Sequence, residues 1–509
     1  MEPVLDIDDI QGHVFPGFGT SHSVVIALQM TDPEIGRAAL ASLLPEVTTM
    51  AISHRSKESR REFMISGEQI EGEQIPSLAI SVAATAVRAW GIDTKGCDKS
   101  YKEGMRVDAA SLGDVIGANA QPADWTFNSQ EANRVDVLIV AGHETRQLLE
   151  QSVSAWLAKL LPAFTLVITE YGRRRLGDKE FFGFHDGVSQ PAVRGITPRG
   201  DYLSRRVIAA DDPRATYYAK PGQVLVWPGS FLFGYPGQSP SVAQAGAIVQ
   251  PPMPWMRNGS YLVFRRLLQD VVAFRNAVDG MELHLRQQGE EVPNGWVAAR
   301  LVGRWPDGTP LTASPAGEDT NISENPNRIN NFRFFASLGP TPLADSGEPP
   351  QMLPAVPADP LGLACPRASH IRQVNPRDGI SEIGQENHPR KLMLRRGITF
   401  GPEVNDAPNA DRGLLFLSYQ TSIVEQFKFV QVNWANATQR PTGDGRDPII
   451  GQDGTTETER NIQIFAPSGR QFRCPFNGRW VIATGGEYFF TPSISGLKHL
   501  LRVQDGRPS

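Results

Sequence analysis

The stretch SVVIALQM at residues 23–30, with the Asp32-Pro33 pair just after it, decides the fold class of this chain. Its β-branched and aliphatic residues are typical of a buried β-strand. Asp before Pro starts a helix well, because proline at the first helical position has no N–H bond to lose. The helix that follows carries apolar residues on one face: Ile35, Leu40 and Leu43. We therefore expect a strand followed directly by an amphipathic helix.

The same strand–helix unit recurs three times along the chain. The later strands are predicted at residues 135–140 (VDVLIV), 261–264 (YLVF) and 414–419 (LLFLSY), and an apolar helical stripe follows each of them. Two units in each half favour an α+β fold with two similar domains, each an antiparallel β-sheet with helices packed on it. We place the domains at residues 1–220 and 221–509. Four such units also occur in unrelated large mixed proteins, so the duplication is a hypothesis.

The composition is that of an ordinary globular protein. Of the 509 residues, 40% are hydrophobic and 21% are charged, and the net charge is −5. This balance disfavours a nucleic-acid partner, which needs a basic surface. No apolar run reaches the ~20 residues of a membrane helix, and no signal segment is visible at the N-terminus, so we expect a cytoplasmic protein without a membrane partner. Three scattered cysteines, Cys97, Cys365 and Cys474, indicate no disulfide framework.

A long irregular segment is predicted at about residues 300–370, in the second half of the chain. It holds seven prolines between residues 340 and 360. Proline fixes φ and removes a backbone donor, so this stretch is expected to be a loop. Loops of this length inside compact domains are usually functional or disordered. This one leads straight to His370.

The segment FFGFHDGVSQP, residues 181–191, is the densest candidate site. Gly183 and Gly187 bracket Asp186, and glycine allows a tight backbone and close approach to a flat ligand. The neighbouring phenylalanines would desolvate Asp186 and raise its pKa, which suits acid–base chemistry. An ordinary Asp-Gly turn explains the same letters. His185 adjoins Asp186 and is a second candidate base.

Two further segments carry candidate ligands. CPRASHIRQVNPR, residues 365–377, contains His370, and a neutral imidazole is the usual proximal ligand of haem iron. Arg372 follows it, and a cation there could meet a haem propionate. LRRGITFGPE, residues 394–403, contains Arg395, which would stay charged in a pocket and could stabilise an anion. Taken singly, a capping or surface histidine and a solvated basic pair explain these residues better.

In this order along the chain, the three segments resemble the dye-decolorising peroxidase family. Gly183-Phe-His-Asp-Gly187 matches that family's Gly-x-x-Asp-Gly motif, and the other two resemble its proximal-histidine and distal-arginine segments. Further similar segments run nearly the whole length: DIDDIQGHVFPGF (6–18), VWPGSFLFGYP (226–236), NGSYLVFRRLLQDVVAF (258–274), GRWPDGTPL (303–311), GLLFLSYQTSIVEQFKFVQ (413–431) and GGEYFFTPSISGL (485–497). The GRWPDGTPL segment and the long loop resemble the longer, more elaborated members.

The resemblance implies two ferredoxin-like domains and one haem b per chain. It implies a peroxidase that uses hydrogen peroxide to oxidise dyes, phenols and other aromatic donors through a ferryl haem. Matched residue by residue, Asp186 is the distal acid, Arg395 the distal arginine and His370 the iron ligand. Less specific matches place other residues at the cofactor: Arg372 near a propionate, Leu414 and Phe416 over the distal haem face, and Gly183 and Gly187 in the motif loop. The compact members have Asn where this chain has Gly397, so no role of that Asn is carried over.

Several alternatives stay open at this point. A haem-binding or iron-releasing protein would use His370 but needs neither Asp186 nor Arg395. A non-haem metal enzyme or a carbohydrate-active enzyme would need a second carboxylate, which the sequence does not indicate. Tyr419 and Trp434 could relay electrons to the surface, although core packing explains them better. The sequence leaves the physiological reductant and the oligomeric state open.

Overall fold

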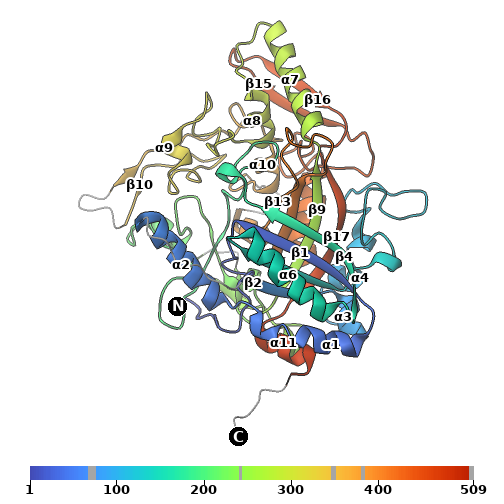
Figure 1. The fold of residues 1–509 in the computed structure, drawn as a ribbon. Helices are drawn as coiled ribbons and strands as arrows, with labels where there is room; N and C mark the ends of the chain where they lie inside the picture. Colours follow the sequence, from blue (N-terminus) through green and yellow to red (C-terminus); the bar gives the residue numbers. More distant parts are fainter. Residues whose placement is uncertain (67–75, 240–242, 345–350, 380–384, 504–509) are drawn as a thin grey trace.

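The centre of the molecule is a closed antiparallel β-barrel (Figure 1). The computed structural model describes residues 1–66, 76–239, 243–344, 351–379 and 385–503. The N-terminal half contributes β1 (His22–Met30), β2 (Ser77–Val82), β3 (Val137–His143) and β4 (Phe164–Arg173). The C-terminal half contributes β9 (Ser260–Gln269), β12 (Leu394–Arg395), β13 (Ile398–Phe400), β14 (Gly413–Gln420) and β17 (Val481–Thr491).

The strand order shows two ferredoxin-like halves. The first half runs β4-β1-β3-β2 and the second runs β17-β9-β14-β13, with β12 on the same edge of β14 as β13. In both halves the fourth strand lies beside the first, then come the third and the second. The fold class and the duplication predicted from the sequence are therefore confirmed. The two sheets are not separate, however, because β13 pairs with β4 and β17 pairs with β2, which closes the barrel.

The helices of two predicted strand–helix units begin directly after aspartate N-caps. The side chain of Asp32 accepts hydrogen bonds from the N–H groups of Glu34 and Ile35 at 3.0 and 2.9 Å, and α1 (Pro33–Ala41) starts there. Asp270 caps α7 (Val271–Gln287) in the same way. These carboxylates satisfy backbone donors that the first helical turn leaves without partners.

Successive side chains of each strand point alternately into the barrel and outward, which creates two apolar layers. Along β1, Val25 and Ala27 belong to the apolar cluster inside the barrel, whereas Val24 and Ile26 pack outward. The outward side chains of the N-terminal half are covered by α1 and by α6 (Arg146–Leu160), which lie across that face in Figure 1. These helices and the outward strand residues form one apolar cluster.

Other elements extend from the C-terminal half. At one end of the molecule, α7 projects with the hairpin of β15 (Arg460–Phe465) and β16 (Gln471–Phe476), and α8 (Trp296–Val302) lies nearby (Figure 1). The described parts of residues 303–369 are mostly irregular, with only α9 (Thr320–Ser323), β10 (Thr341–Pro342) and β11 (Met352–Leu353). Part of the proline-rich stretch, residues 345–350, lies outside the described residues. The segment ends at α10 (His370–Val374).

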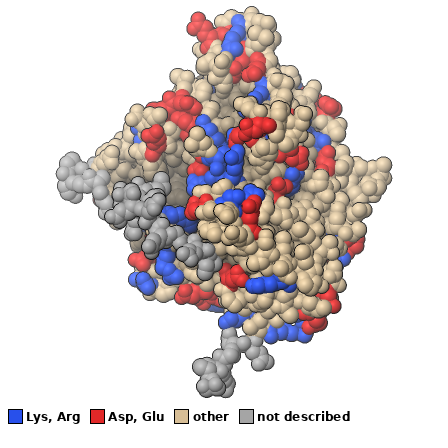
Figure 2. All heavy atoms as spheres, in the orientation of Figure 1, with Lys and Arg blue, Asp and Glu red and all other residues tan. Residues whose placement is uncertain are grey.

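Charges of both signs are interspersed on the face shown in Figure 2. Several arginines form ion pairs; Arg174 meets Asp178 at 2.6 Å, and Arg175 meets Glu403 at 2.6 Å. Within the described ranges, no helix combines the length and apolarity that crossing a membrane requires.

Candidate active site

A cavity of about 730 Å³ lies against the outer face of the C-terminal half of the barrel. Strand β14 forms one wall of the cavity, because its side chains alternate between the two faces of the sheet. Leu414 and Phe416 line the cavity, and Leu415 and Leu417 point into the barrel core. Leu267 on β9 pairs with Leu414 and extends this apolar wall. Leu414 and Phe416, which the resemblance placed at a cofactor, thus face the cavity.

His370, the first residue of α10, also lines the cavity. Its Nδ1 lies 2.7 Å from Oδ2 of Asp447, and Asp447 is fully buried. The other carboxylate oxygen accepts the N–H groups of Ile449 and Ile450 at 2.8 and 2.9 Å. Burial works to lower the pKa of His370, but the charge and hydrogen bond of Asp447 outweigh it, so that this pKa is raised. Nε2 is left as the nitrogen that can bind a metal.

Asp447 is not identifiable from the sequence. It lies 77 positions from His370 in the chain, within a loop-like GRDPII segment that carries no ligand signature. The only usable signal is general: a ligating histidine usually donates its other N–H to a carboxylate or a carbonyl. That rule predicts that such a partner exists, but not which residue it is.

Asp186 and Arg395 meet in the cavity wall. Nη1 of Arg395 lies 3.7 Å from Oδ1 of Asp186, and both side chains are about one third exposed (34% and 38%). Nη2 of Arg395 donates to the carbonyl of Ser189 at 2.9 Å, which fixes the guanidinium beside the motif loop. The loop itself is held by its backbone: the N–H of Asp186 donates to the carbonyl of Asp178 at 3.0 Å. His185 also lines the cavity.

The two motif glycines are needed for backbone conformation. Gly183 has φ of +101° and Gly187 has φ of +73°, values that side chains strongly disfavour. A Cβ atom at either position would meet no heavy atom within 4 Å, so space is not the constraint. Gly187 lines the cavity, whereas Gly183 is not among its lining residues. Both glycines therefore shape the turn that presents Asp186.

Arg372 lies away from the cavity. Its Nη1 donates to the carbonyls of Asp359 and Cys365 at 3.0 and 2.7 Å, and its guanidinium lies over the ring of Phe334 at 4.4 Å. It is 1% exposed and does not line the cavity. The structure thus places Arg372 in the packing behind α10 rather than beside a ligand.

Arg304 and Arg377 also line the cavity, and their guanidinium groups are held by neutral acceptors. Arg304 donates to the carbonyls of Gly308 and Ile329, and Arg377 donates to those of Asn330 and Phe332. Within the described part of the chain, neither forms an ion pair with a carboxylate. Burial lowers the pKa of Arg304 to about 9 and that of Arg377 to about 10. Buried cations of this kind favour an anionic ligand.

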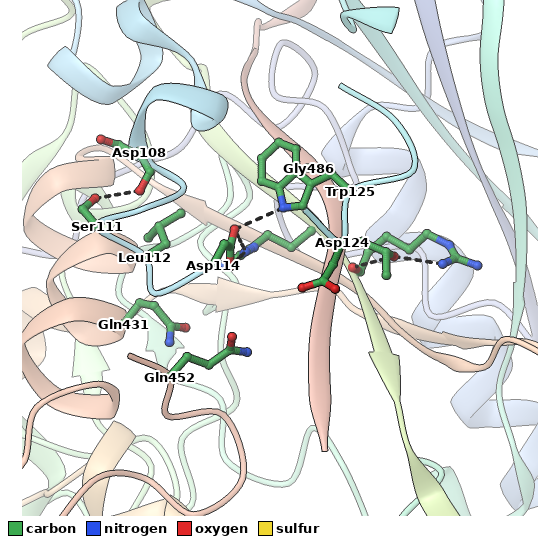
Figure 3. A network of polar contacts seen from close by, with 12 residues as sticks. Asp108, Ser111, Leu112, Asp114, Asp124, Trp125, Gln431, Gln452 and Gly486 are labelled. Atoms are coloured by element: carbon green, nitrogen blue, oxygen red, sulfur yellow. Dashed lines mark hydrogen bonds and ion pairs between the residues drawn. The ribbon is translucent and has the colours of Figure 1, made fainter. Parts of the chain in front are cut away.

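A third lining arginine is already neutralised. Arg265 on β9 places Nη2 2.5 Å from both carboxylate oxygens of buried Asp114, and the indole N–H of Trp125 donates to the same carboxylate at 3.2 Å. Figure 3 shows this cluster beside Gln431 and Gln452, which also line the cavity. The carboxylate of Asp114 therefore neutralises the charge of Arg265.

The proposed electron relays are core residues by position. Tyr419 is fully buried, and its hydroxyl lies 2.7 Å from Nδ1 of His13 inside the barrel. Trp434 is 1% exposed and packs against Phe429 with ring centres 5.3 Å apart. Neither side chain reaches the surface, which favours the core-packing interpretation.

The comparisons with known proteins agree with this arrangement. The family described as "DyP dimeric alpha+beta barrel domain" matches residues 9–175. A dye-decolorizing peroxidase of Mycetinis scorodonius is 28% identical over 98% of this chain and 88% of its own length. A multifunctional dye peroxidase of Amycolatopsis is 29% identical over 84% of this chain and 82% of its own.

A solved structure extends the likeness to three dimensions. An ancestral D-type dye decolorizing peroxidase superposes with a TM-score of 0.75 at 27% identity, covering 98% of this chain and 99% of that one. Fold, length and sequence thus agree over nearly the whole chain. The chain is similar to dye-decolorising peroxidases over nearly its whole length.

Proposed function

We propose that this protein is a haem peroxidase that uses hydrogen peroxide to oxidise dyes, phenols and other aromatic donors. One observation carries the proposal: His370 and the Asp186–Arg395 pair line the same cavity. A potential iron ligand and a proton-transfer pair therefore face one space. The names of the relatives, dye-decolorizing peroxidases, agree with this chemistry.

The residues present fit one haem b per chain. Nε2 of His370 would bind the iron, with Asp447 holding the ring through Nδ1. Arg304 and Arg377 would meet the propionates, since their charges have no carboxylate partner among the described residues. Leu414 and Phe416 supply an apolar surface for the macrocycle. Arg372 is left out of this set because it lies outside the cavity wall.

The protein residues then have separate tasks in peroxide cleavage. Bound haem supplies the iron centre that binds peroxide and the two electrons that break the O–O bond. The Asp186 carboxylate accepts the proton from one peroxide oxygen and returns it to the other, which leaves as water. The Arg395 guanidinium stabilises the negative charge that develops on the departing oxygen. Aromatic donors afterwards return the two electrons one at a time.

A haem carrier or iron-releasing protein is the second candidate function. Such a protein would need His370 and the cavity. It would not need the proton transfer and charge stabilisation that Asp186 and Arg395 could provide. The 3.7 Å contact of that pair at the cavity wall therefore favours turnover over carriage.

The test is a spectrum followed by a rapid-mixing experiment. Purified haem-loaded protein should show a Soret band, and hydrogen peroxide should shift it within a single turnover. His370→Ala should lose haem or change its ligation spectrum, with Asp406→Asn, an exposed aspartate, as control. A Soret band that does not respond to peroxide would favour the carrier.

A further inference from the structure

A second carboxyl group, that of Glu180, lines the cavity wall at the start of the motif loop. Its Oε2 accepts the N–H of Phe182 at 2.8 Å, and its Oε1 accepts the N–H of Phe184 at 2.9 Å. The side-chain amide of Gln269 donates to Oε2 as well. Glu180 thus receives three donors, two from the loop itself and one from β9.

The main chain closes the same turn. The N–H of Glu180 donates to the carbonyl of Phe184, and the N–H of Gly183 donates to the carbonyl of Glu180, both at 2.9 Å. Asp186 follows two residues after this turn. The orientation of Asp186 therefore depends on how rigidly residues 180–184 are held.

Arg175 supports the turn from the other side. Its Nη1 donates to the Glu180 carbonyl at 2.6 Å, and its guanidinium lies over the ring of Phe181 at 4.2 Å. The same guanidinium forms two hydrogen bonds to Glu403, at 2.9 and 2.6 Å. Glu403 and Gln269 both belong to the C-terminal half. The loop that carries Asp186 is thus tied across the two halves at two points.

A carboxyl group suits the Glu180 position better than an amide. Both oxygens face donors, and an amide would place an NH₂ group against a backbone N–H or against Gln269. Burial raises the pKa of Glu180 and the nearby charge of Asp186 adds to this, while the three hydrogen bonds work in the opposite direction. The chain therefore keeps a costly carboxyl group where a neutral side chain would avoid the desolvation penalty.

We propose that Glu180 is a positioning residue for Asp186: its carboxylate fixes the 180–184 turn and ties it to β9 through Gln269. The inference rests on the proposed function, because it assigns to Glu180 the geometry that peroxide cleavage by Asp186 requires. Misplacement of a reacting group by about 1 Å can cost about 100-fold in rate. Glu180 would therefore affect the peroxide step and leave the later electron transfers unchanged.

The test compares Glu180→Gln and Gln269→Met with the wild-type holoenzyme. For Glu180→Gln, we expect the second-order rate constant with hydrogen peroxide to fall about 10- to 100-fold. Gln269→Met, which keeps the length but removes the donor, should lower the same constant by a smaller factor. Reduction of the peroxide-oxidised enzyme by a small phenol should keep its wild-type rate. Glu282→Gln is the matched control, since Glu282 is a buried carboxylate that accepts a backbone N–H outside the cavity.

A second readout does not depend on peroxidase chemistry. Hydrogen–deuterium exchange at residues 181–187 should quicken in Glu180→Gln and Gln269→Met, but not in Glu282→Gln. Wild-type exchange at these amides would overturn the proposal, as would a wild-type peroxide rate constant in a folded, haem-loaded Glu180→Gln variant. If Glu180→Gln does not fold, the peroxide rate constant and the hydrogen–deuterium exchange of Gln269→Met test the proposal in its place. Quickened exchange together with a wild-type protein inert to peroxide would instead refute the proposed function alone.

Discussion

Replacing Asp447 by Asn tests the assignment of His370 most directly. Asn keeps the size of the side chain, and its oxygen can still accept the N–H groups of Ile449 and Ile450. Its NH₂ group would then face Nδ1 of His370, where the carboxylate oxygen now lies at 2.7 Å. The imidazole would have to accept that hydrogen at Nδ1 and carry its own proton on Nε2. A protonated Nε2 cannot bind iron. In the variant, the hydrogen bond from the Asn side chain to Nδ1 therefore competes with the bond from Nε2 to iron.

The size of the effect follows from the lost charge. Removing the outer partner of a ligating histidine typically costs 10- to 100-fold in metal affinity or activity, which is about 1.4–2.8 kcal/mol. A carboxylate makes the histidine a stronger donor and stabilises ferric iron more than ferrous iron. If the whole cost falls on the ferric state, the one-electron potential rises by about 60–120 mV, at 59 mV for each factor of ten.

The assay is a spectroelectrochemical titration of the Fe(III)/Fe(II) couple in haem-loaded protein. Asp453→Asn is the matched control, because Asp453 lies on the same segment but contacts Arg446 and Thr455 rather than His370. We expect a raised potential in Asp447→Asn only. An unchanged potential in a folded Asp447→Asn variant that still holds haem would refute His370 as the ligand or Asp447 as its partner.

Three further predictions follow from the same site and its surroundings. Asp186→Asn should keep the Soret band but lower the rate constant with peroxide by about 10²- to 10⁴-fold in stopped-flow measurements; a wild-type rate would move the base role to His185. Arg377→Leu should weaken haem binding by about 10-fold or more, measured by titrating haem into apoprotein, since a hydrogen bond to a charged group contributes about 1.5–3 kcal/mol. Burial lowers the pKa of His13 to about 3, while unfolded histidine titrates near 6.5, so the unfolded state binds more protons between these values. Stability should therefore fall as the pH drops below about 6.5, by about 1.4 kcal/mol per pH unit from this residue. Thermal unfolding from pH 7 to pH 5 should show a shallower loss in His13→Gln, and an equal loss would contradict the assignment.

The elements were predictable because their determinants are local. The helix starts at Asp32 and Asp270 depend on a carboxylate and on donors within three residues. Closure of the barrel was not predictable, since it depends on pairs such as Thr399 with Arg173 that are distant in sequence. Nothing in the alternation of either strand specifies that partner.

A motif or a resemblance could nominate Asp186, His370 and Arg395 from the sequence, and all three line the same cavity. Proximity in sequence was misleading for Arg372. On a helix, residues two positions apart lie about 200° apart around the axis, so Arg372 must point away from the side that His370 presents. Arg304 comes 66 positions before His370 in the sequence and yet lines the cavity with it. The fold, not the spacing, brings them together.

The duplicated fold also explains why the cavity lies against the C-terminal half. In the N-terminal half, Val24 and Ile26 are covered by α1 and α6. The helix that follows β9 is α7, which projects away from the barrel in Figure 1 and packs its apolar face in a separate cluster. Leu267, Leu414 and Phe416 are thus left facing the cavity. Apolar side chains on a sheet need an apolar layer against them. A flat macrocycle bound there would cover the C-terminal half as α1 and α6 cover the N-terminal half, which couples haem binding to the stability of this face.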